Sequence, residues 1–215
     1  MNCPLCLSND IVPFFERVDV RYGKRIYKKC RTCRLIFIFP ECRLDAAQEK
    51  ARYDTHENSP ENSGYVSFLK KLADPLCARI KSGERGLDFG CGPGPTLSAI
   101  LKERGFEVEN YDPIYFPKKS LLQEQYDFIT CTETVEHFYE PRKEFELLSR
   151  LLKKGGVLGI MTEVLQDESQ FPTWWYPNDP THVSFYQKET FHWLAHWQQW
   201  KGEFSTKNVV FFKRL

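Results

Sequence analysis

The feature that most constrains this chain is the glycine-rich stretch GLDFGCGPG at residues 86–94. It opens with the alternating apolar residues of a buried strand. Gly90, Gly92 and Gly94 follow at alternate positions and predict a tight turn, because glycine adopts a positive φ without steric cost. Residues 96–105 then have the apolar spacing of a helix. The stretch therefore predicts the strand–turn–helix unit of a nucleotide-binding α/β fold, in which the first N–H groups of the helix face the ligand.

The spacing of these glycines separates two classes of nucleotide-binding loop. The dinucleotide fingerprint G-x-G-x-x-G would place its third glycine at position 95, where this chain has Pro95. The chain instead has D-x-G-x-G-x-G, with Asp88 inside the strand. This pattern resembles motif I of the class I S-adenosylmethionine (SAM)-dependent methyltransferases, with a glycine turn in some other α/β domain as the alternative. The resemblance implies a Rossmann-like methyltransferase sheet of the seven-strand type and a set of SAM-binding residues: Asp88, Gly90, Cys91, Gly92 and Gly94.

A second acidic residue ends the next predicted strand, at residues 106–111. In the resembled family an acid at this position accepts the ribose hydroxyls, so the resemblance implies that role for Asp112. The alternative is that Asp112 caps a turn at Pro113. Only residues 113–125 separate Asp112 from the following strand, where the family has a helix and a third strand. We therefore expect a reduced or missing third strand, and the adenine contacts stay open.

Polar residues follow the fourth predicted strand. The carboxyl ends of central strands lie at the ligand crevice, so Thr132 is a predicted cofactor contact. Next comes Glu133-x-x-Glu136-His137, with His182 downstream. This set resembles the divalent-metal site of small-RNA 2′-O-methyltransferases and of ubiquinone-biosynthesis O-methyltransferases, which implies a second divalent ion such as Mn²⁺ or Mg²⁺. Two other interpretations stay open: a metal-free site in which His137 acts as a general base or orients a loop, and a purely structural cluster.

The N-terminal region carries two C-x-x-C pairs, Cys3 with Cys6 and Cys30 with Cys33. Two thiolates three residues apart can face one ion from a tight turn, and two such turns complete a tetrahedral Zn²⁺ site. Short strands are expected between the two pairs. The doubled spacing predicts a zinc ribbon over residues 1–40 with structural zinc, and free thiols or a redox pair are the alternative.

The ribbon is basic. From Glu16 to Arg34 the sequence has eight Lys or Arg residues against two acids. One interpretation is a nucleic-acid patch. The other is that the cations compensate the negative charge of a zinc–thiolate centre. We favour the second, because the aromatic residues of the ribbon do not form a spaced stacking series.

Composition limits the partners. The chain has 215 residues, 41% of them hydrophobic, which suits one sizeable core with a small appendage. A net charge of +1 and a pI near 7.5 give the chain no overall electrostatic attraction to nucleic acid or to a membrane surface. No apolar run approaches the roughly 18 residues that a bilayer requires, so we expect no membrane partner. The first residues lack a secretory pattern and the chain has eight cysteines, so we expect a reducing, cytoplasmic location.

Residues 41–63 are polar and predict a connector with a short helix at 44–51. A helix predicted over residues 64–80 should kink or split at Pro75. In the resembled family, helices in this place lie over the SAM site. Three residues are therefore candidate cofactor or substrate contacts, with a solvated linker as the alternative: Tyr53, His56 and Tyr65.

Residues 163–186 are too long for a simple strand-to-helix connection, and loops of this length are commonly lids or substrate loops. A helix is predicted at 187–200, and the last two strands, at 204–215, should form an antiparallel hairpin. The long loop is rich in aromatic side chains that either stack over an acceptor or pack against the lid helix: Phe171, Trp174, Trp175, Tyr176, Phe185 and Tyr186.

The resemblance covers roughly residues 64–215, so we predict three parts: a zinc ribbon at 1–40, a connector at 41–63 and a SAM-dependent methyltransferase domain at 64–215. The predicted reaction moves a methyl group to an O, N or C nucleophile of a small-molecule acceptor. The alternatives are an RNA-directed enzyme whose ribbon holds nucleic acid, and a non-catalytic SAM- or zinc-binding module. The sequence does not identify the acceptor or the oligomeric state. The predicted catalytic residues are His137, His182, Glu133 and Glu136.

Overall fold

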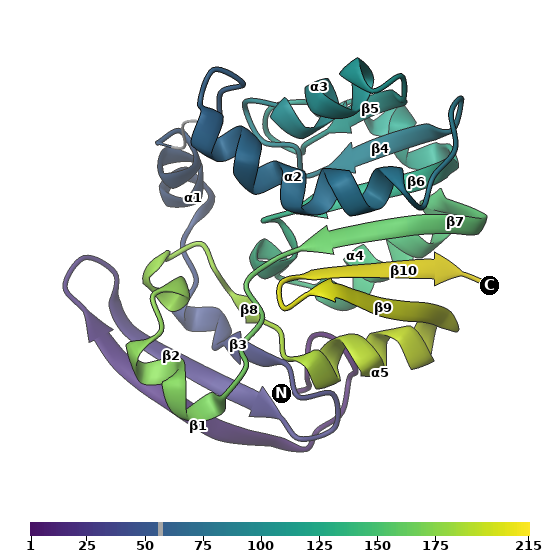
Figure 1. The fold of residues 1–215 in the computed structure, drawn as a ribbon. Coiled ribbons are helices and arrows are strands. Elements are labelled where there is room, and N and C mark those ends of the chain that lie inside the picture. Colours follow the sequence, from purple (N-terminus) through teal and green to yellow (C-terminus); the bar gives the residue numbers. More distant parts are fainter. Residues whose placement is uncertain (56–57) are drawn as a thin grey trace.

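The computed structural model describes residues 1–55 and 58–215, and its centre is a six-stranded sheet (Figure 1). The first four strands in the pairing order are parallel, and the last two form an antiparallel hairpin. This confirms the expected Rossmann-like α/β fold and its closing hairpin. The pairing order is β5 (Glu107–Tyr111), β4 (Arg85–Phe89), β6 (Tyr126–Thr132), β7 (Leu152–Met161), β10 (Val209–Arg214) and β9 (Trp200–Thr206).

The strand order reverses at β4, which pairs with β5 on one side and with β6 on the other. Ligands of open α/β sheets bind outside the carboxyl ends of the strands at such a reversal. The glycine loop follows β4, and the segment with Glu136 and His137 follows β6. The topology therefore brings both predicted functional segments to one edge of the sheet.

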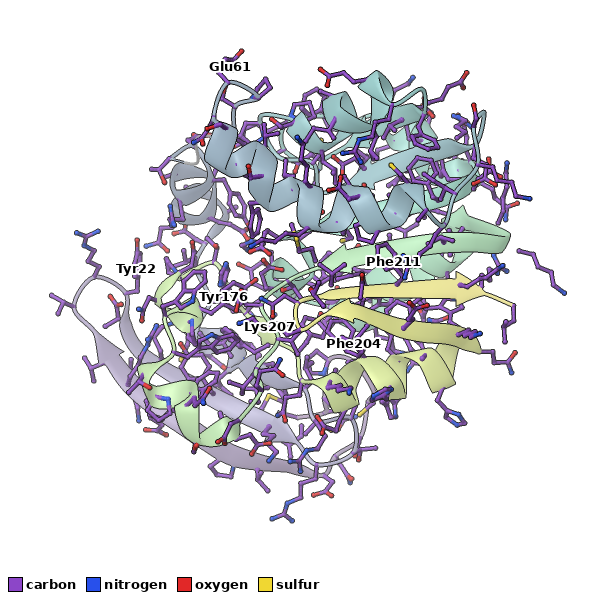
Figure 2. All side chains as sticks on the ribbon, viewed as in Figure 1. Tyr22, Glu61, Tyr176, Phe204, Lys207 and Phe211 are labelled. Atoms are coloured by element: carbon purple, nitrogen blue, oxygen red, sulfur yellow. The ribbon has the colours of Figure 1, made fainter. Side chains whose placement is uncertain are left out.

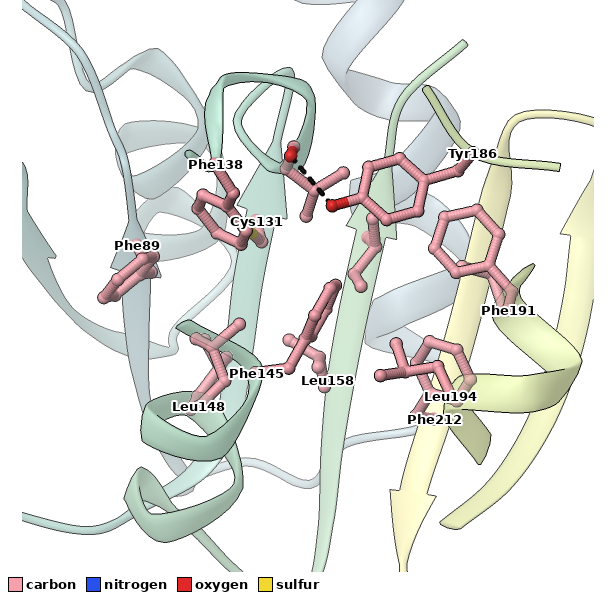
Figure 3. Packing of buried hydrophobic residues seen from close by; sticks show 14 of the residues in the cluster. Phe89, Cys131, Phe138, Phe145, Leu148, Leu158, Tyr186, Phe191, Leu194 and Phe212 are labelled. Atoms are coloured by element: carbon pink, nitrogen blue, oxygen red, sulfur yellow. Dashed lines mark hydrogen bonds between the residues drawn. The ribbon is translucent and has the colours of Figure 1, made fainter. Parts of the chain in front are cut away.

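Helices cover both faces of the sheet because side chains alternate along each strand. In β10, Val209 and Phe211 pack in the cluster of α2 (Ser63–Cys77) and α3 (Thr96–Glu103). Val210 and Phe212 belong to the opposite cluster, which contains α4 (Pro141–Leu151) and α5 (Lys188–Gln198). Figure 3 shows this second cluster between β6, β7 and the two helices, with Phe145, Leu148, Leu158, Phe191, Leu194 and Phe212.

Three local features bear on the sequence predictions. The span 113–125 contains only a short 3₁₀ helix, η2 (Lys119–Gln123), and no strand among its residues, all of which the structure describes; this confirms the missing third strand. The helix is not split at Pro75, because Pro75 lies inside α2, which runs on to Cys77. β7 begins at Leu152, directly after α4.

The N-terminal strands form a separate four-stranded sheet that a distant segment completes. β3 (Ile36–Ile38) pairs with β8 (Ser184–Phe185), with Ile36 opposite Phe185. The same strand continues the pairing through Ile38, whose N–H donates to Val183 at 2.9 Å. The order of this sheet is β1 (Ile11–Asp19), β2 (Gly23–Cys30), β3 and β8.

Aromatic residues of the long loop fill the space between this sheet and the rest of the chain. Phe171, in the 3₁₀ helix η4 (Glu168–Thr173), lies 5.0 Å from the Phe14 ring and 5.1 Å from the Tyr27 ring. Phe185 lies 5.7 Å from Tyr27. Neither interpretation of these two rings was correct, because they pack against the ribbon and not over an acceptor or on a lid helix.

The basic side chains of the ribbon contact the same long loop. Lys29 and Arg34 pair with Glu168 at 2.5 and 2.8 Å. The buried Arg25 donates to the carbonyl oxygen of Pro180 at 2.9 Å. Arg17 donates to Asn178 at 2.7 Å. Much of the local positive charge is therefore used inside the chain, which the sequence did not indicate.

The connector holds two short helices. The first is η1 (Pro40–Cys42), and α1 (Ala46–Tyr53) begins with Asp45, whose side chain accepts the N–H of Gln48. α1 leads toward Asn58, and the predicted contact His56 lies outside the described residues. Across the part of the chain that the structure describes, no helix combines the length and apolarity needed to cross a bilayer.

Candidate active site

The glycine loop leaves β4 at the carboxyl edge of the sheet. Gly90 and Gly92 have φ angles of 75° and 65°, the left-handed region that favours glycine. The N–H of Gly92 donates to one carboxylate oxygen of Asp112 at 3.1 Å. The other oxygen of Asp112 accepts the N–H groups of Ile114 and Tyr115 at 2.8 and 3.0 Å. Asp112 thus caps its turn and also ties the glycine loop to the end of β5, while its ribose role stays a prediction.

The connector returns onto the glycine loop. A Cβ at Gly94 would collide with the carbonyl oxygen of Asn58. The Thr96 hydroxyl donates to the same oxygen at 3.1 Å. Gly94 is therefore required by the close approach of the chain itself, where the connector crosses the loop.

Asp88 is an acid in an apolar strand. It is 3% exposed, and the Thr130 hydroxyl donates to it at 2.7 Å. Burial raises the pKa of Asp88 to about 6. Burial and the nearby charges of Asp88 and Glu133 raise the pKa of Tyr65, which places this α2 residue near both acids. The Thr132 hydroxyl, at the end of β6, is buried without a hydrogen-bond partner among the described residues.

A 3₁₀ turn, η3 (Val135–His137), presents the second group of candidate residues. One donor atom each from Glu136, His137 and His182 lies within 4.8 Å of the others. The turn is fixed to the long loop, because the N–H of Val183 donates to the Glu136 carbonyl at 2.8 Å. We call Glu136, His137 and His182 the triad.

The backbone sets the protonation of both histidines. Nδ1 of His137 lies 3.1 Å from the Thr181 carbonyl oxygen, and Nδ1 of His182 lies 2.8 Å from that of Tyr176. Since a carbonyl oxygen only accepts, Nδ1 of each ring donates a proton to it, and Nε2 is the ring nitrogen left for any other partner. Burial and the adjacent His137 lower the pKa of His182 to about 3, so it is neutral at pH 7. The two rings lie 4.9 Å apart.

A buried polar network supports Glu136. Its carboxylate accepts hydrogen bonds from the Tyr176 hydroxyl at 2.5 Å and from the Thr162 hydroxyl at 3.0 Å. Burial raises the pKa of Glu136. The sequence placed Tyr176, in the 3₁₀ helix η5 (Tyr176–Asn178), only in an aromatic loop, and gave Thr162 no role. The available signal was a threonine directly after β7, at the edge of the sheet where ligands bind.

Glu133 lies outside the triad, which corrects the predicted set of four. It has a φ of 48°, and its N–H donates to Met161, so it extends the β6–β7 pairing before the 3₁₀ turn begins. Its carboxylate lies 3.5 Å from the Tyr176 hydroxyl. Burial and the charge of Glu136 raise its pKa well above the usual range.

Tyr53, the last residue of α1, packs against the triad. Its ring meets the His137 ring edge to face at 5.2 Å, and its hydroxyl donates to Glu49 at 2.8 Å. Arg52, the residue before it, pairs with Asp179 at 2.7 Å. The candidate contacts Tyr53 and Tyr65 therefore lie at the triad and at the buried acids, respectively.

The four N-terminal cysteines form a separate cluster. Their sulfur atoms lie within 4.8 Å of one another, with Cys3 to Cys33 at 3.5 Å and Cys6 to Cys30 at 3.4 Å. A disulfide would need about 2.05 Å. Two sulfurs of a tetrahedral zinc site, each about 2.3 Å from the ion, lie roughly 3.8 Å apart. The sulfur spacing therefore fits a metal centre and not a disulfide.

Comparisons with known proteins point in one direction. A family profile described as a methyltransferase domain matches residues 61–202. The ubiquinone biosynthesis O-methyltransferases of Salmonella newport and Klebsiella pneumoniae are 29% and 28% identical to this chain over 122 residues. Each match covers 50% of this chain and 50% of the relative, so the chain spans about half the length of the curated relatives it matches.

Solved structures share the fold. The magnesium protoporphyrin IX methyltransferase of Synechocystis, with bound SAH, has a TM-score of 0.53 and 15% identity, covering 71% of this chain and 84% of that chain. A SAM-dependent methyltransferase from Archaeoglobus fulgidus has a TM-score of 0.50 and 19% identity, covering 70% and 99%. At these identities the likeness concerns the fold alone.

Proposed function

The chain belongs to the methyltransferase-domain family of class I SAM-dependent enzymes, and we propose that it methylates a hydroxyl oxygen of a small acceptor held at the triad. The observation that carries the proposal is the placement of Glu136, His137 and His182 at the sheet edge that also holds the glycine loop. The names of the curated relatives, O-methyltransferases, support oxygen as the acceptor atom.

The donor set suits SAM. Its ammonium and sulfonium groups are cationic, and Asp88 and Glu133 are buried acids whose pKa is raised because too little compensates their charge. We propose that Asp88 pairs with the ammonium group and Asp112 with the ribose. Gly90, Cys91, Gly92 and Gly94 would line the loop, and Thr132 would offer its unpaired hydroxyl.

Bound SAM supplies an activated methyl group for in-line displacement. The work of the protein is then to align the acceptor oxygen and to take its proton. Nε2 of His137 is suited to this task, because the Thr181 carbonyl holds its ring with the lone pair available. Tyr53 packs on the same ring and fixes its orientation.

We propose a divalent cation at the triad as the alternative arrangement, in which Nε2 of His137 is a ligand and not the base. Two imidazoles and one carboxylate suit a borderline ion such as Mn²⁺, or Mg²⁺ with waters. The hydrogen bonds from Nδ1 to carbonyls are the outer contacts that orient histidine ligands. Such an ion supplies a lower pKa for a bound hydroxyl.

We also propose that Cys3, Cys6, Cys30 and Cys33 hold structural zinc, on the evidence of their sulfur spacing. The cluster lies against the methyltransferase domain, because the N–H of Arg142 donates to the Pro4 carbonyl at 3.2 Å. The ribbon therefore belongs to the same folded body as the site.

Asp88→Asn is expected to change stability and binding in opposite directions. The pKa of the Asp88 carboxyl is about 6 in the folded chain, above the value of 3.8 in the unfolded chain. Its contribution to the stability of the fold is therefore fully present below pH 3.8 and is lost as the pH rises through 6. Above pH 6 the variant without SAM should be more stable by at most about 3 kcal/mol, and its SAM affinity should fall.

Melting curves and calorimetric titration with SAM at pH 7.5 measure both effects. Asp127→Asn is the matched control on β6, since there burial raises the carboxyl pKa but the hydrogen bonds from Lys153 and the Arg85 N–H and the charge of Lys153 together lower it below its usual value. It should not gain stability and should keep SAM affinity. A loss of stability in Asp88→Asn would contradict the assignment.

The test of function is release of S-adenosylhomocysteine from SAM with a panel of hydroxylated metabolites, with and without chelator. We expect turnover that mild chelation lowers and that Mg²⁺ or Mn²⁺ restores. Glu136→Gln should weaken restoration by either ion by about 10- to 100-fold, because it removes one ligand. Turnover that the chelator leaves unchanged would contradict a metal ion at the triad. SAM binding without turnover on any acceptor would favour a non-catalytic module.

A further inference from the structure

A cleft of about 700 Å³ lies between the tip of the β1–β2 hairpin and helix α1. Figure 1 shows the hairpin tip and α1 on the same side of the molecule, and Figure 2 labels Tyr22 at that tip. The chain beyond η5 forms the inner wall. The lining includes Arg21 and Tyr22 of the hairpin, Gln48 and Arg52 of α1, and Asn178 and Pro180.

The cleft adjoins the triad. Arg52 immediately precedes Tyr53, whose ring contacts His137. Pro180 lies two residues before His182. Arg52 also pairs with Asp179, whose carbonyl oxygen accepts the N–H of His182 at 3.2 Å, so these contacts connect the cleft wall to the triad.

The acids at the cleft are already engaged. Asp19 accepts the N–H groups of Arg21 and Tyr22 at 2.8 and 3.0 Å. Asp179 accepts the N–H and the hydroxyl of Thr181, and it pairs with Arg52. These contacts use the carboxylate oxygens as acceptors within the wall.

The cations at the cleft are less compensated. Arg21 is exposed on the hairpin tip. Behind the wall, the fully buried Arg25 donates to the carbonyl oxygens of Pro180 and Cys42, which carry no formal charge. Arg17 contacts Asn178 in the same wall and has a buried Nε with no partner among the described residues. Among the residues named here, four arginines (Arg17, Arg21, Arg25 and Arg52) stand against two carboxylates (Asp19 and Asp179), so the balance of formal charge is positive.

We propose that this cleft binds an anionic group of the acceptor, a phosphate or a carboxylate, while the hydroxyl to be methylated lies at the triad. The inference rests on the proposed function and adds a substrate class to it. A cleft of this volume suits a small molecule. Nucleic acid is disfavoured, because three basic residues of the ribbon, Arg17, Lys29 and Arg34, are engaged with the long loop.

Inorganic pyrophosphate is the direct probe, titrated into the full chain by calorimetry at low ionic strength. Arg21→Ala should weaken its binding by about tenfold, the scale of one charge-assisted hydrogen bond, and Arg21→Glu should weaken it further. Lys201→Ala, an exposed cation on β9, is the matched control and should bind as the unmodified chain does. Melting temperature and SAM affinity should be the same in all four proteins.

Paired acceptors identify the anion. If methyl transfer favours 3,4-dihydroxybenzoate over catechol in an Arg21-dependent way, the anion is a carboxylate; if it favours uridine 5′-monophosphate over uridine, the anion is a phosphate. Pyrophosphate binding that is unchanged in Arg21→Glu would overturn the proposal. So would an oligoribonucleotide that binds with steep salt dependence through Lys28 and Arg31. Failure of the proposed function can be told apart from failure of this proposal. If the proposed function is wrong, SAM uptake or methyl transfer will not be observed, whereas the pyrophosphate result does not depend on either.

Discussion

His137→Ala is expected to lower the rate constant of methyl transfer by about 10²–10⁴-fold, the usual contribution of a positioned general base, and to leave SAM affinity unchanged. The ring stands at the junction of three elements. The Thr181 carbonyl fixes its Nδ1, Tyr53 packs on its face, and the His182 ring lies 4.9 Å away. Its removal takes away the proton acceptor or, in the alternative arrangement, one of the proposed metal ligands, while the glycine loop follows a different strand, β4.

Single-turnover transfer of a labelled methyl group, with SAM affinity measured separately, tests this expectation. His192→Ala is the matched control, since His192 is exposed on α5 and lies outside the triad. The assignment is wrong if His137→Ala transfers methyl groups at the full rate. If the variant instead loses SAM binding, His137 belongs to the cofactor site and not to the acceptor site.

If the cysteine cluster holds zinc as proposed, Cys33→Ser is expected to lower the bound zinc and to abolish methyl transfer while SAM binding persists. Structural zinc contributes on the order of 10 kcal/mol to small ribbons, so loss of one ligand should unfold β1, β2 and β3. β3 holds β8 in its sheet, and Val183 ties that segment to the Glu136 carbonyl. Loss of the ribbon therefore removes the support for His182.

Metal content by atomic absorption, turnover and calorimetric SAM titration separate these effects. Cys77→Ser is the control, because Cys77 lies on α2 outside the cysteine cluster. Full turnover by a zinc-free Cys33→Ser protein would show that the ribbon does not support the site. Loss of SAM binding together with turnover would mean that the ribbon supports the whole fold.

Local patterns predicted the parts of the fold that depend on local chemistry. The glycine loop follows from positive φ angles, which the sequence marks with glycine at positions 90 and 92. The cysteine pairs follow from ligand spacing, and the missing third strand follows from the length of the span 113–125. Each of these predictions depends on residue types and their spacing along the chain, so one sequence was sufficient to make it.

Contacts between segments far apart in the chain could not be predicted from the sequence. β8 has only two residues, and its pairing with β3 depends on which surfaces meet in the folded chain. The hydrogen bond from Arg25 to Pro180 spans 155 residues. The sequence therefore could not place the aromatic rings of the long loop against the ribbon, nor find the cleft between the hairpin and α1.

The candidate site shows the same division. The sequence brought Glu136, His137 and His182 together by resemblance, and the structure gathers their donor atoms. It could not separate Glu133 from them, because the left-handed conformation of Glu133 is set by its pairing with Met161. The role of Tyr176 depends on its buried hydrogen bond to Glu136, and no local sequence pattern predicts that hydrogen bond.

The most direct test is a crystal structure of the full chain grown with saturating S-adenosylhomocysteine. We expect density for one ligand, with its ribose beside Asp112, its amino acid end toward Asp88, and its sulfur facing the triad. A ligand bound elsewhere, or a fully ordered glycine loop with no ligand at saturating concentration, would contradict it.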